Sequence, residues 1–153
     1  MKKIIEPISI KKILNELNPS TFVRNTNFAN HEIYIVNHSN APNTLQEIGR
    51  LREITFRAAG GGTGKELDLD DFDTRDEAFY SQLIVWDPDA SAIIGGYRFI
   101  KGTDIIDSNK YHDLATNNLF EFEASFNNTF LPYTIELGRS FVQPGYQPAL
   151  GNR

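Results

Sequence analysis

The sequence predicts an α/β protein of the α+β kind, built from both strands and helices. Two observations carry this prediction. Several short stretches alternate apolar with polar residues, which is the pattern of half-buried strands, and other stretches repeat apolar residues at helical spacing. The chain has 153 residues, which is enough for one domain with a core of its own.

Residues 9–17 have the pattern of a short amphipathic helix. Ser9 can cap it, and the apolar residues on one face are Ile10, Ile13, Leu14 and Leu17. An ordinary packed helix explains the pattern. Because four lysines fall among the first twelve residues, a docking face for a membrane surface or an acidic protein is the alternative.

A longer helix is predicted for residues 44–60, with Leu45, Ile48 and Phe56 on its apolar face. Arg52 lies on the same face. It is either an arginine whose long stem reaches solvent or a buried arginine held by carboxylates from elsewhere in the chain.

The glycine-rich residues 59–65 follow this helix. They do not form a nucleotide phosphate loop, because Ala59 stands where that motif needs glycine and Glu66 where it needs serine or threonine. A flexible lid is predicted instead, since glycine lowers the cost of moving the backbone.

Four strands are predicted, at His31–Asn37, Tyr80–Asp87, Ala92–Lys101 and Thr134–Val142. Residues 88–91 join the second and third strands into a hairpin. The paired glycines in the third strand allow another backbone or a ligand to come close.

The last strand organises the candidate site. Glu136 and Arg139 interrupt its apolar residues, and ionised side chains are rarely buried unless they are paired or functional. Because side chains alternate between the faces of a strand, these two would lie on opposite faces of a regular strand. A bulge at Gly138 would bring both into one cleft. A structural ion pair at a sheet edge is the alternative.

The overall composition excludes several kinds of function. The 15 basic and 20 acidic residues give a net charge of −5, which argues against nucleic-acid binding. Without cysteine, the chain has no disulfide, thiol nucleophile or thiolate metal site, and no histidine has a carboxylate at metal-ligand spacing.

Neither a signal peptide nor a membrane span is predicted. A cytoplasmic location is expected, and a peripheral contact with the inner face of the membrane is compatible with it.

Residues 66–77 are strongly acidic, so some of these carboxylates are expected to bind buried or substrate cations rather than form only a solvated turn. The charged residues that remain for chemistry are Arg52, Asp70, Asp73, Arg98, Glu136 and Arg139.

These residues stand in a recognisable series of motifs: Leu51-Arg52-x3-Phe56, Asp70-x2-Asp73, Gly96-x-Arg98 and Glu136-x2-Arg139. The series resembles the acyl-homoserine-lactone synthases, which are relatives of the GNAT N-acyltransferases. The fuller segments LREITFR, LDLDDFD, IIGGYRF and IELGRSFVQPGYQ are more similar to a sister group, the ornithine-lipid and glycine-lipid N-acyltransferases, often labelled hemolysin-like. The resemblance covers residues 44–146.

The resemblance implies a GNAT-like or autoinducer-synthase-like fold, with a mixed, mostly antiparallel sheet that is flanked by helices and splayed at its middle. It also implies an enzyme that moves a 3-hydroxyacyl group from acyl carrier protein to the α-amine of an amino acid, ornithine or glycine, in aminolipid synthesis. The donor would be the thioester on the 4'-phosphopantetheine of the carrier protein, with no tightly bound cofactor and no metal. Acyl carrier protein and the amino-acid acceptor are therefore the expected partners.

The resemblance also implies roles for the site residues. Glu136 and Arg139 would be catalytic, with Glu136 removing a proton from the attacking ammonium directly or through water. One of the arginines would hold the acceptor carboxylate through two hydrogen bonds. Backbone donors of the opened strand would stabilise the oxyanion of the tetrahedral intermediate. The substrate-binding residues would be Arg52, Phe56, Asp70, Asp73 and Arg98.

The chain departs from these relatives in two places. Lactone synthases carry a tryptophan in the loop after the first helix, where this chain has Gly60–Gly64, and this argues against lactone synthesis. The relatives also continue past the fourth strand, into a pantetheine-binding helix and strands that enclose the acyl chain.

Residues 1–28 are predicted to be an N-terminal amphipathic extension. Residues 29–153 are predicted to be the N-terminal part of an acyltransferase domain, incomplete at its C-terminus, which could be inactive alone.

Two other functions remain open. One is an acyl-homoserine-lactone synthase, which would use S-adenosylmethionine as its acceptor. The other is a non-enzymatic, membrane-binding module of the hemolysin-like type, which would lyse vesicles without any acyl donor. For docking an acidic carrier protein, the basic residues available are Lys2, Lys3, Lys11 and Lys12, or residues outside this sequence.

Overall fold

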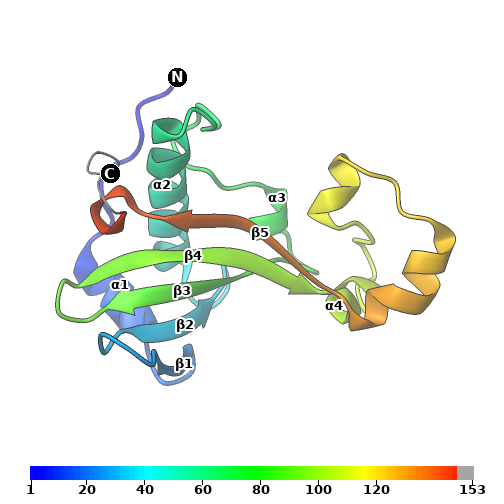
Figure 1. Ribbon diagram of the computed structural model, residues 1–153, viewed down its shortest axis with the longest axis horizontal. Helices are drawn as coiled ribbons and strands as arrows, with labels where there is room; N and C mark the ends of the chain where they lie inside the picture. The colour runs from blue at the N-terminus through cyan, green and yellow to red at the C-terminus, as the bar shows by residue number, and fades with distance from the viewer. Residues whose placement is uncertain (148–153) are drawn as a thin grey trace, which may run out of the picture.

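A five-stranded antiparallel sheet forms the centre of the computed structural model, which describes residues 1–147 (Figure 1). The strands lie in chain order, and each pairs with the next. They are β1 (Phe22–Asn25), β2 (Glu32–Val36), β3 (Ser81–Asp87), β4 (Ala92–Lys101) and β5 (Ile135–Val142). The predicted α+β architecture with a mostly antiparallel sheet is confirmed.

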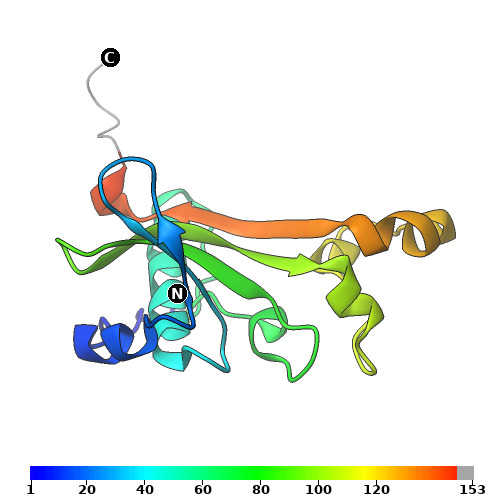
Figure 2. The same ribbon diagram turned by 90° about the horizontal axis from the view of Figure 1, so that it is seen from below.

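The helices α1, α2 and α3 lie on one face of this sheet (Figure 2). The α-helices are α1 (Ile10–Glu16), α2 (Pro42–Ala58), α3 (Asp71–Thr74) and α4 (Gly102–Ile106). Four further short turns of helix are η1 (Ala115–Asn118), η2 (Phe126–Phe130), η3 (Leu131–Tyr133) and η4 (Pro144–Tyr146). Both predicted helices and all four predicted strands are present. The four-residue strand β1 and helix α3 carry too little periodicity for the sequence to reveal them.

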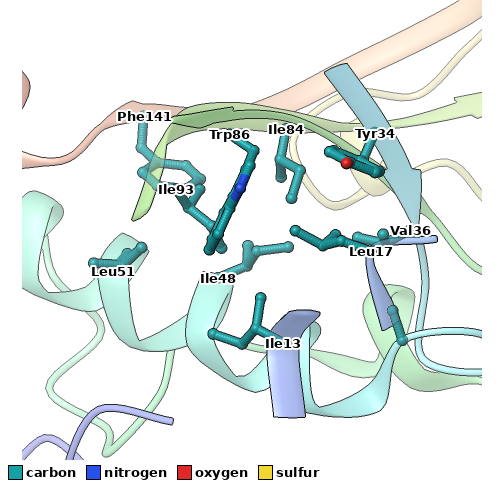
Figure 3. Close-up of a cluster of buried hydrophobic side chains, with 11 residues drawn as sticks. Ile13, Leu17, Tyr34, Val36, Ile48, Leu51, Ile84, Trp86, Ile93 and Phe141 are labelled. Carbon is teal, nitrogen blue, oxygen red and sulfur yellow. The ribbon is translucent and has the colours of Figure 1, made fainter. Parts of the chain in front are cut away.

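The main hydrophobic core lies between the sheet and the helices α1 and α2. Figure 3 shows Ile84 and Trp86 pointing from the sheet toward Ile48 of α2, while Ile13 approaches from α1. Ile48 and Ile84 are fully buried, and each such side chain contributes about 1.5–3 kcal/mol through removal from water. This packing fixes α2 against the strands that carry the candidate site.

The N-terminal segment belongs to this packing. α1 contacts α2, and β1 pairs with β2. Glu16, at the end of α1, accepts hydrogen bonds from the backbone N–H groups of Asn43 (3.0 Å) and Thr44 (2.7 Å) in the first turn of α2. These are donors that a helix start leaves without intrahelical partners. Burial of Glu16 disfavours its charge, but the hydrogen bonds outweigh this and lower its pKa.

The paired glycines of β4 bring backbones together, as the sequence predicted. A Cβ atom at Gly95 would overlap the carbonyl oxygen of Phe141, and one at Gly96 would overlap that of Leu83. Any side chain here would therefore push β3 or β5 away from β4.

The glycine-rich loop 59–65 differs from the predicted flexible lid. Glu53 accepts hydrogen bonds from the N–H groups of Thr63 (3.1 Å) and Gly64 (2.8 Å), and it pairs with Arg57 at 2.6 Å. Lys2 donates its backbone N–H to the carbonyl of Gly64 at 2.8 Å. Glycine is needed here for a physical reason other than mobility, because Gly60 and Gly64 have φ values of 82° and 77°.

Residues 102–134 form an arm that extends from the ends of β4 and β5 (Figure 1). A second, smaller hydrophobic cluster joins the arm to the sheet and contains Tyr80, Ile100, Ile105, Leu114 and Leu131. The short helix η1 lies within the arm. Across residues 1–147, no helix is long and apolar enough to cross a membrane.

Candidate active site

The candidate site lies on the helix-covered face of β3, β4 and β5. Strand pairing sets Gln82, Arg98 and Gly138 in one row across the three strands. In the next row, Ile100 is paired with Glu136. α2 and α3 lie on the same face of the sheet (Figure 2), so residues far apart in the sequence meet over these rows.

β5 contains the predicted irregularity, but not at Gly138. Arg98 is paired with Gly138 and Gly96 with Phe141, so two residues of β5, Arg139 and Ser140, oppose one residue of β4. The positive φ, 52°, belongs to Arg139. The prediction of a bulge is confirmed, and its position at Gly138 is wrong by one residue.

This error has a physical reason. Glycine was the expected bulge residue because it adopts positive φ without cost. The structure instead places a non-glycine residue there, where the left-handed conformation costs on the order of 1 kcal/mol. The predicted consequence holds, because Glu136 and Arg139 line one cleft.

The deep end of the site is a buried ionic cluster. Arg52 is 0% exposed, so the interpretation of a buried arginine held by carboxylates is confirmed. Its Nε donates to Asp68 at 3.1 Å, and Nη1 and Nη2 each lie 3.4 Å from Asp73. Asp73 also accepts hydrogen bonds from the Gln82 amide (2.9 Å) and the backbone N–H of Asp70 (3.1 Å). Buried charges are tolerated when they are paired and hydrogen-bonded in this way.

The cluster opens toward solvent through Arg98 and Arg139. Nη1 of Arg98 lies 2.7 Å from Asp70 and 3.2 Å from Asp73. Nη2 of Arg139 lies 3.4 Å from Asp70 and 3.7 Å from Asp68. The side chain of Arg139 is 34% exposed, against 6% for Arg98. Arg139 is therefore the most accessible and least tightly held of the three guanidinium groups.

Charge pairing shifts the protonation equilibria in this part of the cluster. Burial opposes ionisation of Asp70, but the hydrogen bond and charge of Arg98, with a smaller contribution from Arg139, hold the pKa of Asp70 below its ordinary value. Burial likewise disfavours the charged form of Arg98, yet Asp73 and Asp70 raise its pKa. Both groups are therefore charged at neutral pH.

Glu136 differs from the other carboxylates of the site. Its Oε2 is buried and has no hydrogen-bond partner among the described residues. A buried carboxylate oxygen without a donor is unfavourable, since folding removes the water it would otherwise bind. Such an oxygen is available to accept a hydrogen bond from a bound molecule or from a neighbouring side chain.

These groups line one open cleft of about 440 Å³. Its charged lining residues are Asp70, Arg98, Glu136 and Arg139. Its other lining residues are Phe72 of α3, Leu137 and Gly138 of β5, and four residues of the arm around η1. The cleft is large enough for a small amino acid together with the reactive end of a second substrate.

The structure brings together Arg52, Asp70, Asp73, Arg98, Glu136 and Arg139, as the sequence motifs predicted. Phe56 does not join them. Its partly buried ring packs against the main hydrophobic core and does not line the cleft. Within residues 1–147, no group of three or more histidine, cysteine or carboxylate residues is placed to hold a metal ion.

Asp68, Gln82 and Tyr80 are also buried at the site, and the sequence motifs do not include them. Asp68 lies in the acidic stretch two residues before Asp70, where its burial could not be distinguished from exposure. Tyr80 and Gln82 alternate with less buried residues at the start of β3. This alternation is the sequence signal that could have identified both as inward-facing.

Residues 51–151 match the model of the acetyltransferase (GNAT) domain family. The chain belongs to the GNAT family. The five-stranded antiparallel sheet with helices on one face is the α+β, GNAT-like arrangement expected of it.

Two curated relatives are similar over nearly the whole chain. The glycine N(alpha)-acyltransferase of Bacteroides thetaiotaomicron is 51% identical over 148 residues, which cover 96% of this chain and 44% of that protein. The protein of the same name from Phocaeicola vulgatus is 47% identical over 148 residues, covering 96% of this chain and 45% of its own length. The chain thus spans less than half the length of these GNAT relatives. No solved structure matches it.

Proposed function

We propose that this GNAT chain supplies the acceptor side of a glycine Nα-acyltransferase. The observation that carries the proposal is the cleft in which Glu136 has a buried, unpartnered carboxylate oxygen and Arg139 has an accessible guanidinium. A proton acceptor and a carboxylate anchor in one cleft suit a zwitterionic amino acid. The names of the two relatives support glycine as that amino acid.

Arg139 is the arginine best suited to bind the acceptor carboxylate. Arg52 is fully buried and already bound to Asp68 and Asp73, and Arg98 is nearly buried and bound to Asp70. Arg139 makes only long contacts, through Nη2, with the acidic residues. A guanidinium with free N–H groups can bind a carboxylate through two parallel hydrogen bonds.

Glu136 would then act as the base. It takes one proton from the glycine ammonium, directly or through a water molecule, and leaves a neutral amine. The amine nitrogen attacks the thioester carbonyl carbon, and the tetrahedral intermediate collapses with cleavage of the C–S bond. The thiolate leaves and is protonated, and the second proton on nitrogen is lost, so that an amide and a free thiol are the products.

The strand β5 offers donors for the oxyanion of this intermediate. It is the last strand of the sheet among residues 1–147, so the N–H groups along its outer edge pair with no strand there. The bulge at Arg139 and Ser140 turns this edge locally. Backbone N–H groups placed in this way can stabilise developing negative charge.

The donor is proposed to be a fatty acyl group on acyl carrier protein, and the product an N-acyl amino acid for aminolipid synthesis. Lys11 and Lys12 lie on α1, at the end of the molecule opposite the arm (Figure 1). Lys2 and Lys3 lie near Glu66 and Glu6. These lysines remain the proposed docking surface for an acidic carrier protein.

The decisive experiment uses the longest open reading frame that contains this chain. Purified wild-type protein is mixed with glycine and either acyl carrier protein or coenzyme A carrying a 3-hydroxyacyl group, and products are identified by mass spectrometry. Wild type should form N-acylglycine, and Glu136→Gln should lower kcat by roughly 10²–10⁴-fold. Glu121→Gln, the same change at an exposed position of the arm, is the control and should retain the wild-type rate.

Three results would separate the alternatives. Absence of any acylated amine with active donor would refute the acyltransferase. Acylation of ornithine rather than glycine would refute the proposed acceptor while keeping the chemistry. Lysis of vesicles by the purified protein without donor would favour the membrane-binding module.

A further inference from the structure

Tyr80 does not line the cleft but contacts three residues that do, Phe72, Arg98 and Ala115. It precedes β3 and is 0% exposed. Its ring packs edge-on against Phe72, with centroids 5.6 Å apart, and the guanidinium carbon of Arg98 lies 4.9 Å from the ring centroid. The side chain is thus held by contacts from α3 and β4 and has little freedom to move.

The hydroxyl of Tyr80 already has one partner, and this partner defines where its proton can go. The backbone N–H of Ala115 donates to the hydroxyl oxygen at 2.9 Å. The phenol is therefore the acceptor in that bond, and its own proton remains to be donated to another group. A buried hydroxyl with no acceptor for its proton would be unfavourable.

The acceptor that matches this donor is Glu136. Ser81 pairs with Phe99, and Ile100 pairs with Glu136, so Tyr80 and Glu136 belong to one row on either side of Ile100. Glu136 has a buried oxygen without a partner. The two groups lie close enough to influence each other: burial raises the pKa of Tyr80, and the nearby negative charge of Glu136 raises it further.

We propose that Tyr80 is a positioning residue that donates a hydrogen bond from its hydroxyl to the carboxylate of Glu136. This inference rests on the proposed function, in which Glu136 is the base. The hydrogen bond fixes the direction of the carboxylate, and it favours the ionised form that accepts a proton. Two hydrogen bonds in series then connect the arm to the base: the N–H of Ala115 donates to the hydroxyl of Tyr80, and this hydroxyl donates to the carboxylate of Glu136.

The other charged groups that line the cleft with Glu136 are Asp70 beside α3, Arg98 on β4 and Arg139 on β5. The two arginines favour an ionised Glu136, and Asp70 opposes it. Replacing Tyr80 by phenylalanine changes none of these charges. An altered pH dependence in that variant therefore reports the lost hydrogen bond.

The test measures kcat/KM for glycine against pH with the longest open reading frame containing this chain. In Tyr80→Phe the acidic limb should move to higher pH by roughly half to one unit, because protonated Glu136 cannot act as a base. At neutral pH the value should fall roughly fivefold to tenfold. Melting temperatures of all variants are measured in parallel.

Tyr34→Phe is the matched control. Tyr34 is also buried, and its hydroxyl donates to a glutamate, Glu32, at 2.7 Å, but both residues lie on β2, outside the cleft. The same chemical change there should leave the pH profile unmoved. An equal shift in both variants would overturn the proposal, because it would then reflect general loosening of the sheet.

A double-mutant cycle isolates the route of the effect. If Tyr80 acts through Glu136, then Tyr80→Phe should change the residual rate of Glu136→Gln by less than about twofold. A full additional loss in the Glu136→Gln background would overturn the proposal. Wild-type protein without N-acyltransferase activity would refute the proposed function, whereas an active wild type with an unmoved Tyr80→Phe profile would refute only the role of Tyr80.

A second variant covers the case in which Tyr80→Phe does not fold. Incorporation of 3-fluorotyrosine at position 80 keeps the shape and the hydroxyl but makes the phenol a stronger hydrogen-bond donor. The acidic limb should then move to lower pH, opposite to the shift in Tyr80→Phe. An unmoved limb in the fluorinated protein would overturn the proposal.

Discussion

The two ends of the ionic cluster use the same residue types under different conditions. At the buried end, Arg52, Asp68 and Asp73 are at most 1% exposed and bind one another. At the open end, Arg139 is partly exposed and makes long contacts, and Glu136 lines the cleft without an ion pair among the described residues. Saturated charges hold the strands and helices in place, whereas unsaturated charges remain available to a substrate. Motif residues of one family can therefore differ in role according to their burial.

The largest effect should come from breaking the buried end. Arg52→Met would leave Asp68 and Asp73 buried without their main cation, and should lower the free energy of unfolding by about 3–5 kcal/mol. Urea denaturation followed by circular dichroism measures this loss. Arg139→Met, which removes the same group from the open end, is the control and should cost about 1 kcal/mol or less. Equal losses in the two variants would contradict the distinction between the ends.

Glu53, outside the ionic cluster, is another buried carboxylate whose hydrogen bonds are satisfied, and its contribution to stability can be tested by changing the pH. Burial opposes its charge, but hydrogen bonds from Thr63, Arg57 and Gly64 outweigh this and lower its pKa to about 2. A carboxylate whose pKa is lower in the folded chain stabilises the fold above its unfolded pKa, near 4.5, and loses this effect as pH falls toward 2.

The free energy of unfolding should therefore decrease by about 2 kcal/mol from this group as pH falls from about 5 to about 2. Glu53→Gln should remove most of this part of the decrease. Urea titrations at several pH values compare the two proteins. A variant with the same acid dependence as the wild type would show that Glu53 does not hold the glycine-rich loop in solution.

A substitution at the open end of the cluster should weaken substrate binding more than it lowers the stability of the fold. In Arg139→Met the KM for glycine should rise roughly 10-fold or more, the loss expected for charge-assisted hydrogen bonds to a carboxylate, with kcat affected less. Steady-state kinetics on the longest open reading frame measures both constants. A fall in kcat at constant KM would instead place Arg139 at the transition state.

The smallest effect concerns the backbone of the bulge. Arg139 has a φ of 52°, which glycine adopts freely and alanine does not. Arg139→Gly should therefore be more stable than Arg139→Ala by up to about 1 kcal/mol, although both lack the guanidinium. Thermal melts of the two variants give this difference. A more stable alanine variant would show that the bulge is not retained without the arginine.

The sequence alone determined the long elements and the composition of the site. Alternation in the four predicted strands and apolar spacing in α1 and α2 depend on local periodicity, and local periodicity follows directly from strand and helix geometry. Arg52 on an apolar helix face, together with Glu136 and Arg139 in an apolar strand, marked charged residues that needed partners. These signals are local, so they survive without knowledge of the tertiary structure.

Only the tertiary structure decided which charges are saturated. Asp68 and Asp70 stand two residues apart in one acidic stretch, yet Asp68 is buried against Arg52 while Asp70 borders the cleft. Tyr80 became part of the site through its contacts with Phe72, Arg98 and Ala115, which lie on other elements. The positive φ lies at Arg139 rather than at Gly138, and in this conformation Arg139 pairs with Asp68 and Asp70. Burial and long-range pairing depend on the packing of separate elements, which no local pattern specifies.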